Sequence, residues 1–396
     1  MILGFTVLRT KYVDTISFLF NVAILGMQRM MEYAIEIRMY SFGMLFVFCT
    51  FLFATKLLDE PKKKQNYIRL TIFAILSSYI HYFACASAIV IYIFVLLVAF
   101  RRKEYKRMKY VFFSGLVVAI SYLPWLFVFF NQVATVKNDY WISPITWASV
   151  IVDILFMFLF NSNFEYLILT AITFSIFILG LNGAIYLMKK KNTTAIFGIT
   201  VLFGTLVLGI ILSLIIRPIF FPRYLMSASA CMWLGIILGL SNIWNKKNFK
   251  IFLMITFICV GFACNGLYTK NEIVNENNVN STNEKIESYL HKNTIIITND
   301  TSAQQEMAYL YPQNELSIIG SSIGNKDLTV KVYSQCKLSE TNDLMTFKNY
   351  NSNILVLDNT GNLTKELKNF GYPLTKITDG KISADESSTL QIFNIE

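Results

Sequence analysis

Apolar runs recur along the first 270 residues, and short loops rich in lysine and arginine separate them. A helix needs about 20 apolar residues to cross a bilayer, where every backbone polar group must be satisfied within the chain. Hydrophobic residues make up 55% of the 396 residues and charged residues only 15%, too apolar a balance for one soluble domain. The sequence therefore predicts an α-helical polytopic membrane protein.

Charged residues divide this apolar part into about nine candidate transmembrane helices. They lie near residues 13–28, 39–55, 70–82, 84–100, 111–130, 165–188, 194–216, 225–243 and 251–267. The stretch from 70 to 100 has basic flanks on both sides, so we predict two passes with a turn at His81 and Tyr82. A re-entrant hairpin would give the same sidedness, whereas a single tilted helix would break the charge rule.

The formal net charge of the chain is +10, and its lysine and arginine residues concentrate in one set of short loops between the apolar spans. This distribution is typical of cytoplasmic loops and argues against nucleic acid as a partner. These loops hold the basic residues at 9–11, 56–69, 101–109, 189–191 and 246–250. Before the last apolar span, the opposite loops hold only Arg29, Arg38, Lys137, Arg217 and Arg223. Basic loops stay on the cytoplasmic side. We therefore predict a multi-pass plasma-membrane protein with Arg9 inside and the C-terminal region outside.

The composition changes at about residue 270 to Asn, Ser, Thr, Lys and Glu. Residues 1–269 form the predicted transmembrane domain, and the Asn-rich segment 270–283 is predicted to be a flexible linker. In residues 284–396, strand patterns near 294–298, 316–320, 353–358 and 390–395 alternate with helix patterns near 283–291, 303–311 and 363–370. This alternation predicts a small extracytoplasmic α/β domain.

Charged and aromatic clusters converge on the predicted outer face. They are Glu36, Arg38 and Tyr40; His81 and Tyr82; Tyr140 and Trp141; and Arg217, Arg223 and Tyr224. Charge beside an apolar span is costly and often functional, and the arginine fork suits phosphate. Each arginine alone is equally explained by snorkelling or by pairing with Glu32 or Glu36. A histidine at a helix end would explain His81 alone, and anchoring at the membrane interface would explain Tyr140 and Trp141.

Five short motifs, taken together and in order, resemble landmarks of bacterial glycosyltransferase family 39. They are Glu36-Ile-Arg-Met-Tyr-Ser41, Ser78-Tyr-Ile-His-Tyr-Phe83, Tyr122-Leu-Pro-Trp125, Tyr140-Trp-Ile-Ser-Pro144 and Arg217-Pro-Ile-Phe-Phe-Pro-Arg-Tyr224. The family belongs to the GT-C membrane enzymes, relatives of protein O-mannosyltransferases. The resemblance covers about residues 1–270, and members often carry a hydrophilic C-terminal domain.

The resemblance implies transfer of a sugar from a polyprenyl-phosphate-linked donor to a glycan, lipid or protein acceptor on the extracytoplasmic face. Arg217, Arg223 and Tyr224 would then hold the donor phosphate among membrane lipids. Arg38, Tyr40, His81, Tyr82, Tyr140 and Trp141 would organise or line the pocket. Some GT-C enzymes need a divalent metal, although no metal-ligand spacing is visible in the sequence.

The family's base is an acidic residue in an outer loop between the first two helices. This chain enters at what resembles the third helix, so Glu36 is the one remaining candidate that we favour. We therefore expect a truncated or split form of the enzyme, or a chain that has lost catalysis. A lipid-sugar transporter and a non-catalytic lipid-sugar-binding subunit remain alternatives, although the internal repeats typical of transporters are not visible.

Overall fold

A computed structural model describes twelve stretches of the chain. The chain divides into two compact units, with the boundary between Leu267 and Tyr268. The described residues are 2–27, 30–36, 38–138, 145–155, 164–216, 218–244, 247–291, 293–318, 338–340, 344–349, 353–382 and 389–395. The first unit is helical, and the second contains a mixed β-sheet.

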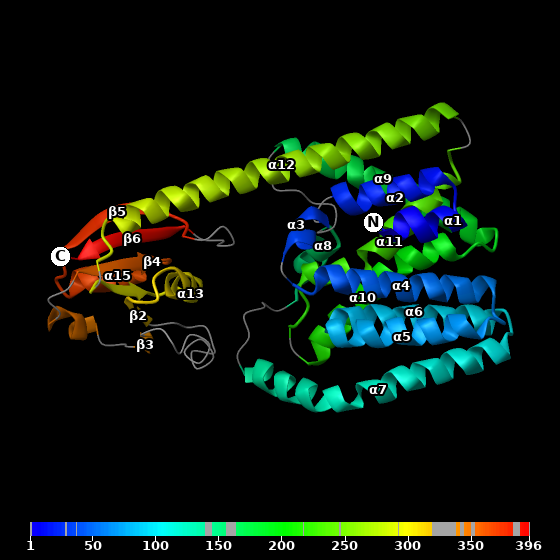
Figure 1. Cartoon of the computed structure of the whole chain (residues 1–396), viewed down its shortest axis with the longest axis horizontal. Helices are drawn as coiled ribbons and strands as arrows, with labels where there is room; N and C mark the ends of the chain where they lie inside the picture. The colour runs from blue at the N-terminus through cyan, green and yellow to red at the C-terminus, as the bar shows by residue number, and fades with distance from the viewer. Residues whose placement is uncertain are drawn as a thin grey trace. The chain divides into compact units, whose positions relative to one another are not determined.

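Long helices make up the first unit (Figure 1). The chain begins with the short η1 (Gly4–Leu8) and α1 (Arg9–Lys11). The long helices and the short elements between them then follow in this order: α2 (Asp14–Gly26), α3 (Met30–Ile35), α4 (Tyr40–Asp59), α5 (Lys64–Ile80), α6 (Tyr82–Arg101), α7 (Tyr105–Asn138), α8 (Trp147–Leu155), α9 (Phe164–Lys189), α10 (Thr194–Ile215), η2 (Pro222–Leu225), α11 (Met226–Ser241) and α12 (Lys247–Glu287).

Within the described residues, seven helices are long and apolar enough to cross a membrane: α4, α6, α7, α9, α10, α12 and α11 with η2. The predicted number of about nine is therefore too high by this measure. Helix α2 has 13 residues and α5 has 17, and at 1.5 Å per residue these span only about 20 Å and 26 Å. The predicted turn at His81 is confirmed, because α5 ends at Ile80 and α6 begins at Tyr82.

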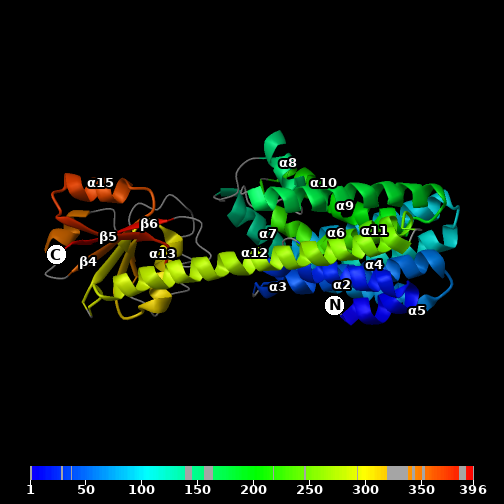
Figure 2. The ribbon, with the colours of Figure 1, turned by 90° about the horizontal axis from the view of Figure 1, so that it is seen from above.

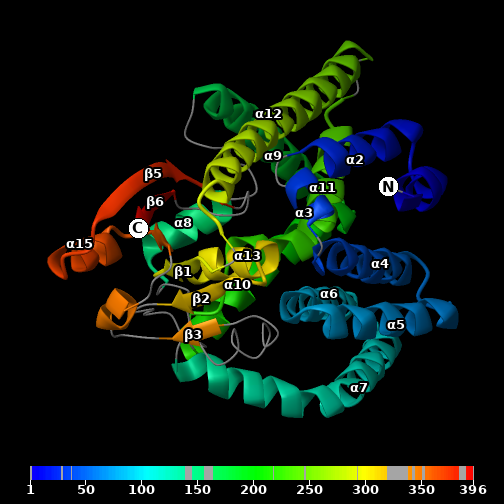
Figure 3. The same cartoon turned by 60° about the vertical axis from the view of Figure 1, so that its left-hand side comes forward.

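Helix α11 is the centre of the first unit and contacts α2, α4, α6, α9 and α10 (Figure 3). Small residues allow this burial, since helices in membranes associate by close packing rather than by exclusion of water. Gly235 packs on the backbone of α10 at Ala195, and Gly239 packs on the backbone of α9 at Gly180. A methyl group at Gly239 would overlap the carbonyl oxygen of Gly180.

We expect Gly239→Ala to destabilise the helical unit, because neither backbone can yield without separating α9 from α11. Overpacking of a dense core typically costs about 1–3 kcal/mol. Gly266→Ala is the matched control, because no atom lies within 4 Å of an added methyl group there. Thermal unfolding in detergent checks this prediction, and equal midpoints for the two variants would contradict it.

The second unit is a six-stranded sheet with the order β3-β2-β1-β4-β6-β5. Its strands are β1 (Ile295–Thr298), β2 (Glu315–Ile318), β3 (Leu338–Glu340), β4 (Ile354–Asp358), β5 (Leu374–Gly380) and β6 (Leu390–Ile395). The first four strands pair in parallel, and β6 and β5 add antiparallel pairs at one edge. The predicted α/β character of this domain is therefore confirmed, whereas β3 and β5 were not predicted.

Two helices cover opposite faces of this sheet. Helix α15 (Asn362–Asn369) buries Leu363 and Leu367 on one face (Figure 2). Helix α13 (Thr301–Leu310) buries Ala303 and Met307 on the other face. The last turns of α12 join the second face through Ile286.

The flexible linker predicted for residues 270–283 is wrong, because these residues continue helix α12 to Glu287. Asparagine disfavours a helix by well under 1 kcal/mol per residue, so neighbouring packing can outweigh it. Within the second unit, Ile286, just after this segment, is buried against the sheet.

Candidate functional site

Three separate parts of the chain meet at one end of the helical unit: the start of α4, the turn between α5 and α6, and η2. They bring together Arg38, Tyr40, His81, Arg223 and Tyr224, which we call the Arg38–Arg223 cluster. The His81 ring lies 6.3 Å from the ring of Tyr40 and 5.0 Å from that of Tyr224, measured between centroids. Residues more than 180 positions apart in the sequence therefore lie close together at this end of the helical unit.

His81 begins helix α6 and is held by it. Its backbone is extended, and its Nδ1 accepts a hydrogen bond from the backbone N–H of Phe83 at 3.2 Å. Burial, and then the positive charge of Arg223, lower the pKa of His81 to about 4. The imidazole is therefore neutral at pH 7, and Nε2 carries the proton because Nδ1 accepts. His81 offers the site one N–H donor without adding a charge.

Arg223 and Tyr224 are positioned by the tight turn after α10. The Ser213 hydroxyl oxygen accepts hydrogen bonds from the backbone N–H groups of Ile219 and Phe220, at 3.2 and 2.9 Å. The Arg223 guanidinium then lies 4.8 Å from the Phe221 ring centroid and 5.9 Å from that of Tyr224. Aromatic faces attract a cation and hold it in place.

Tyr224 is fixed by ring packing from α6. Its ring stacks on Phe83 at 4.8 Å between centroids, with 21° between the planes. Phe83 in turn contacts Phe220 from the same turn at 5.5 Å. Tyr224 is therefore held by a packed set of aromatic rings.

Glu36 lies beside Arg38 of the cluster, just before α4. One oxygen of Glu36 lies 4.0 Å from the Arg38 guanidinium, and the two side chains are 31% and 47% exposed. The second Glu36 oxygen, Oε2, has no hydrogen-bond partner within the described residues. An exposed ion pair this long contributes little stability.

The charges of Arg38 and Arg223 act on the same group, the hydroxyl of Tyr40, and Arg38 also forms a hydrogen bond with it. Tyr40 itself is 5% exposed and packs edge-on against Tyr33 at 5.2 Å. Two guanidinium groups whose charges both reach one buried hydroxyl make this end of the helical unit positively charged. Positive charge of this kind suits an anion with several oxygens.

Tyr82 does not join this cluster. Its hydroxyl donates a hydrogen bond to Gln132 and accepts one from the Trp125 indole N–H at 3.3 Å, so it packs against α7. The Phe129 ring completes this contact at 5.4 Å. Three further predicted residues lie outside the described part of the chain: Tyr140, Trp141 and Arg217.

An apolar groove of about 300 Å³ begins beside the cluster, at Ser41. Met44, Leu45 and Phe48 of α4 line one wall, and Phe20 and Ile24 of α2 line another. Ser41 directly follows Tyr40 of the cluster, so the lining of the groove reaches the residue next to the cluster. A charged head and an apolar tail on one molecule would match this arrangement.

Asp153 on α8 is an acidic residue that the sequence analysis missed. It is 7% exposed, and burial raises its pKa from 3.8 to about 6. A carboxyl group with such a pKa suits proton transfer near neutral pH. The signal in the sequence was one acidic residue within an apolar nine-residue helix.

The raised pKa of Asp153 predicts a pH-dependent effect on stability. Above pH 6 the folded chain must keep a buried carboxylate ionised, whereas below pH 3.8 both states hold the proton and the cost disappears. Asp153→Asn removes this cost, so we expect it to raise the thermal midpoint at pH 7.5 and to leave it nearly unchanged at pH 4. An equal shift at both pH values would contradict burial as the cause.

Within the described residues, no group of three His, Cys, Asp or Glu side chains is placed to bind a metal ion. Comparisons with protein-family models, with curated proteins and with solved structures found no match to this chain.

Proposed function

We propose that this protein is a membrane glycosyltransferase that uses a polyprenyl-phosphate-linked sugar as donor on the extracytoplasmic face. The observation that carries the proposal is the cluster of Arg38, Arg223 and the Tyr40, His81 and Tyr224 rings beside an apolar groove. The guanidinium groups match the donor phosphate, and the groove matches its isoprenoid chain. The ordered resemblance to glycosyltransferase family 39 agrees with this assignment.

The proposed reaction is a direct displacement at the anomeric carbon of the donor sugar. Glu36 takes the proton of the acceptor hydroxyl, whose oxygen forms the new bond to the anomeric carbon. The bond from that carbon to the phosphate oxygen breaks, and polyprenyl phosphate leaves with the electron pair. Arg223 and Arg38 stabilise the charge that develops on this leaving group.

His81 would assist by position and by hydrogen bonding. Its neutral Nε2–H can donate to a phosphate or sugar oxygen without a change of protonation during the reaction. A charged imidazole would instead compete with acceptor deprotonation, since it would add an acid beside the base. Because the pKa of His81 is lowered to about 4, the imidazole stays neutral and can serve as this donor at any pH well above 4.

Sugar release and sugar transfer by the full chain in proteoliposomes test the proposal. Radiolabelled polyprenyl-phosphate hexose is supplied with a lipid, glycan or peptide acceptor, and both labelled product and free polyprenyl phosphate are measured. Equal formation of the two products supports transfer. Donor binding without either product would instead favour a non-catalytic binding subunit, and movement of intact donor between leaflets would favour a transporter.

A further inference from the structure

A second polar site lies at the other end of the helical unit, where a cavity of about 560 Å³ forms. Helix α4 ends there at Leu58 and Asp59, and helix α10 begins there at Thr194. Since α4 has 20 residues from Tyr40 to Asp59, about 30 Å separate this cavity from the Arg38–Arg223 cluster. The two sites share no residue, and the charge rule predicts that this one faces the cytoplasm.

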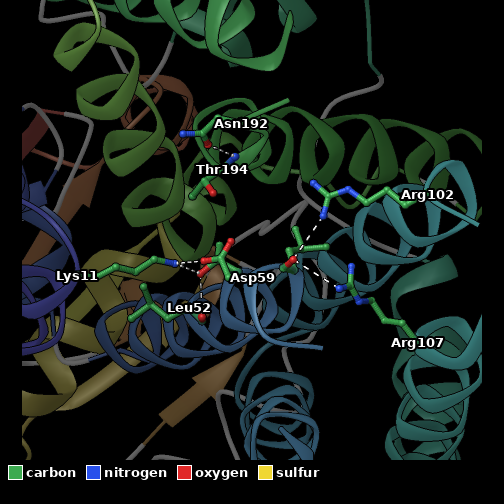
Figure 4. Close-up of polar contacts among 9 residues, drawn as sticks. Lys11, Leu52, Asp59, Arg102, Arg107, Asn192 and Thr194 are labelled. Atoms are coloured by element: carbon green, nitrogen blue, oxygen red, sulfur yellow. Dashed lines mark hydrogen bonds and ion pairs between the residues drawn. The ribbon is translucent and has the colours of Figure 1, made fainter. Parts of the chain in front are cut away.

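Positive charge exceeds negative charge on the wall of this cavity. Lys11, Arg102 and Lys191 line it, and Asp59 is the one acidic residue among its lining residues. Asp59 is already engaged by Lys11 at 2.8 Å (Figure 4). Within the described residues, neither Arg102 nor Lys191 has a carboxylate within 4.0 Å.

Arg102 is held in place by the end of α4. Its guanidinium donates a hydrogen bond to the Leu58 carbonyl oxygen at 3.4 Å, and Arg107 approaches the same oxygen at 3.5 Å (Figure 4). Arg107 is buried and forms an ion pair with Glu104, so it serves the framework of the cavity. Within the part of the chain that the structure describes, the bond to Leu58 is the one hydrogen bond that the Arg102 guanidinium makes.

The start of α10 adds neutral hydrogen-bonding groups. The Thr193 side chain makes no capping hydrogen bond, and Ala195 of the first turn is among the lining residues. The Thr194 backbone N–H donates a hydrogen bond to the Asn192 side-chain oxygen at 3.3 Å (Figure 4). The first N–H groups of a helix lack partners within the helix and attract anions. Asn192, Ser241 and Asn242 bring amide and hydroxyl groups to the same wall.

We propose that this cavity binds a phosphate ester with a hydroxylated head, such as glycerol phosphate, either free or as the headgroup of an anionic phospholipid. Arg102, Lys191 and the start of α10 would receive the phosphate. Asp59 and the amide and hydroxyl side chains would receive the hydroxyl groups. The cavity volume is many times the roughly 30 Å³ that one water molecule occupies. The cavity therefore has room for a head larger than inorganic phosphate.

Two binding measurements on the full chain in phosphatidylcholine nanodiscs test the proposal and separate the two sources. Calorimetric titration with glycerol 1-phosphate measures the soluble ester. Native mass spectrometry after addition of phosphatidylglycerol measures the lipid. Arg102→Ala and Lys191→Ala are compared with Arg101→Ala, which removes the same kind of charge from the neighbouring position but does not line the cavity.

We expect Arg102→Ala and Lys191→Ala each to weaken binding of at least one probe about tenfold or more, the scale of a charge-assisted hydrogen bond. Arg101→Ala should change binding less than about twofold, because Arg101 does not line the cavity and its charge is screened by solvent. Binding of the lipid alone identifies a headgroup site, and binding of both probes identifies a site for the ester itself. Loss of binding that is equal for all three variants, or no binding of either probe, would overturn the proposal.

Discussion

Replacing Glu36 by glutamine should lower sugar transfer by about 10²–10⁴-fold, the usual contribution of a general base. Glutamine keeps the size and the hydrogen-bonding atoms of the side chain but cannot take the acceptor proton. Donor binding should change little, since the long ion pair with Arg38 is partly exposed. The measurement is single-turnover transfer of a radiolabelled sugar from its polyprenyl phosphate.

Glu60→Gln is the matched control for this prediction. Glu60 follows the opposite end of helix α4 and is 61% exposed, so its replacement removes a charge far from the cluster. Transfer by Glu36→Gln at the rate of Glu60→Gln would show that the base lies elsewhere. Asp153 would then be the next residue to replace, because its pKa of about 6 suits the same task.

Replacing Arg223 by alanine should weaken donor-lipid affinity by about 1.5–3 kcal/mol, or roughly 10- to 150-fold. The Phe221 and Tyr224 rings hold the guanidinium beside Tyr40 and His81, so the loss removes a positioned donor rather than a mobile surface charge. Arg223→Lys should recover only part of the affinity, because lysine lacks the planar fork.

Arg9→Ala is the matched control for Arg223→Ala. Arg9 is 64% exposed and pairs with Asp14 at 2.9 Å, away from the cluster. Affinity is measured with a fluorescent polyprenyl phosphate in nanodiscs. Equal affinities for wild type, Arg223→Ala and Arg9→Ala would show that Arg223 does not bind the donor and would favour the alternative that it snorkels toward lipid headgroups.

The helices could be predicted from the sequence because charged residues interrupt the apolar runs. The turn at His81 is one example, since two basic flanks required an even number of passes between them. Crossing is harder to predict than helix formation, as the short α2 and α5 show. The helical segment 270–283 was missed because composition describes local preference, whereas Ile286 docks on a sheet formed by residues far along the chain.

The site could be predicted only as a set of residues at one end of the bundle. His81 and Tyr82 are neighbours in sequence, yet His81 is extended before α6 and contacts Tyr224, while Tyr82 is helical and contacts α7. The groove beside Ser41 depends on the packing of α2 against α4, which no local pattern encodes. Strand β5 was missed because its residues are mostly polar and partly exposed at the sheet edge.

Photo-crosslinking with a polyprenyl phosphate that carries a diazirine near its head tests the central claim most directly. The full chain is labelled in proteoliposomes, and the crosslinked peptides are identified by mass spectrometry. The account predicts labelling of α4 between Ser41 and Phe48, lost when unlabelled polyprenyl phosphate competes and weakened in Arg223→Ala. Labelling confined to other helices, or labelling of α4 that is insensitive to competition, would contradict it.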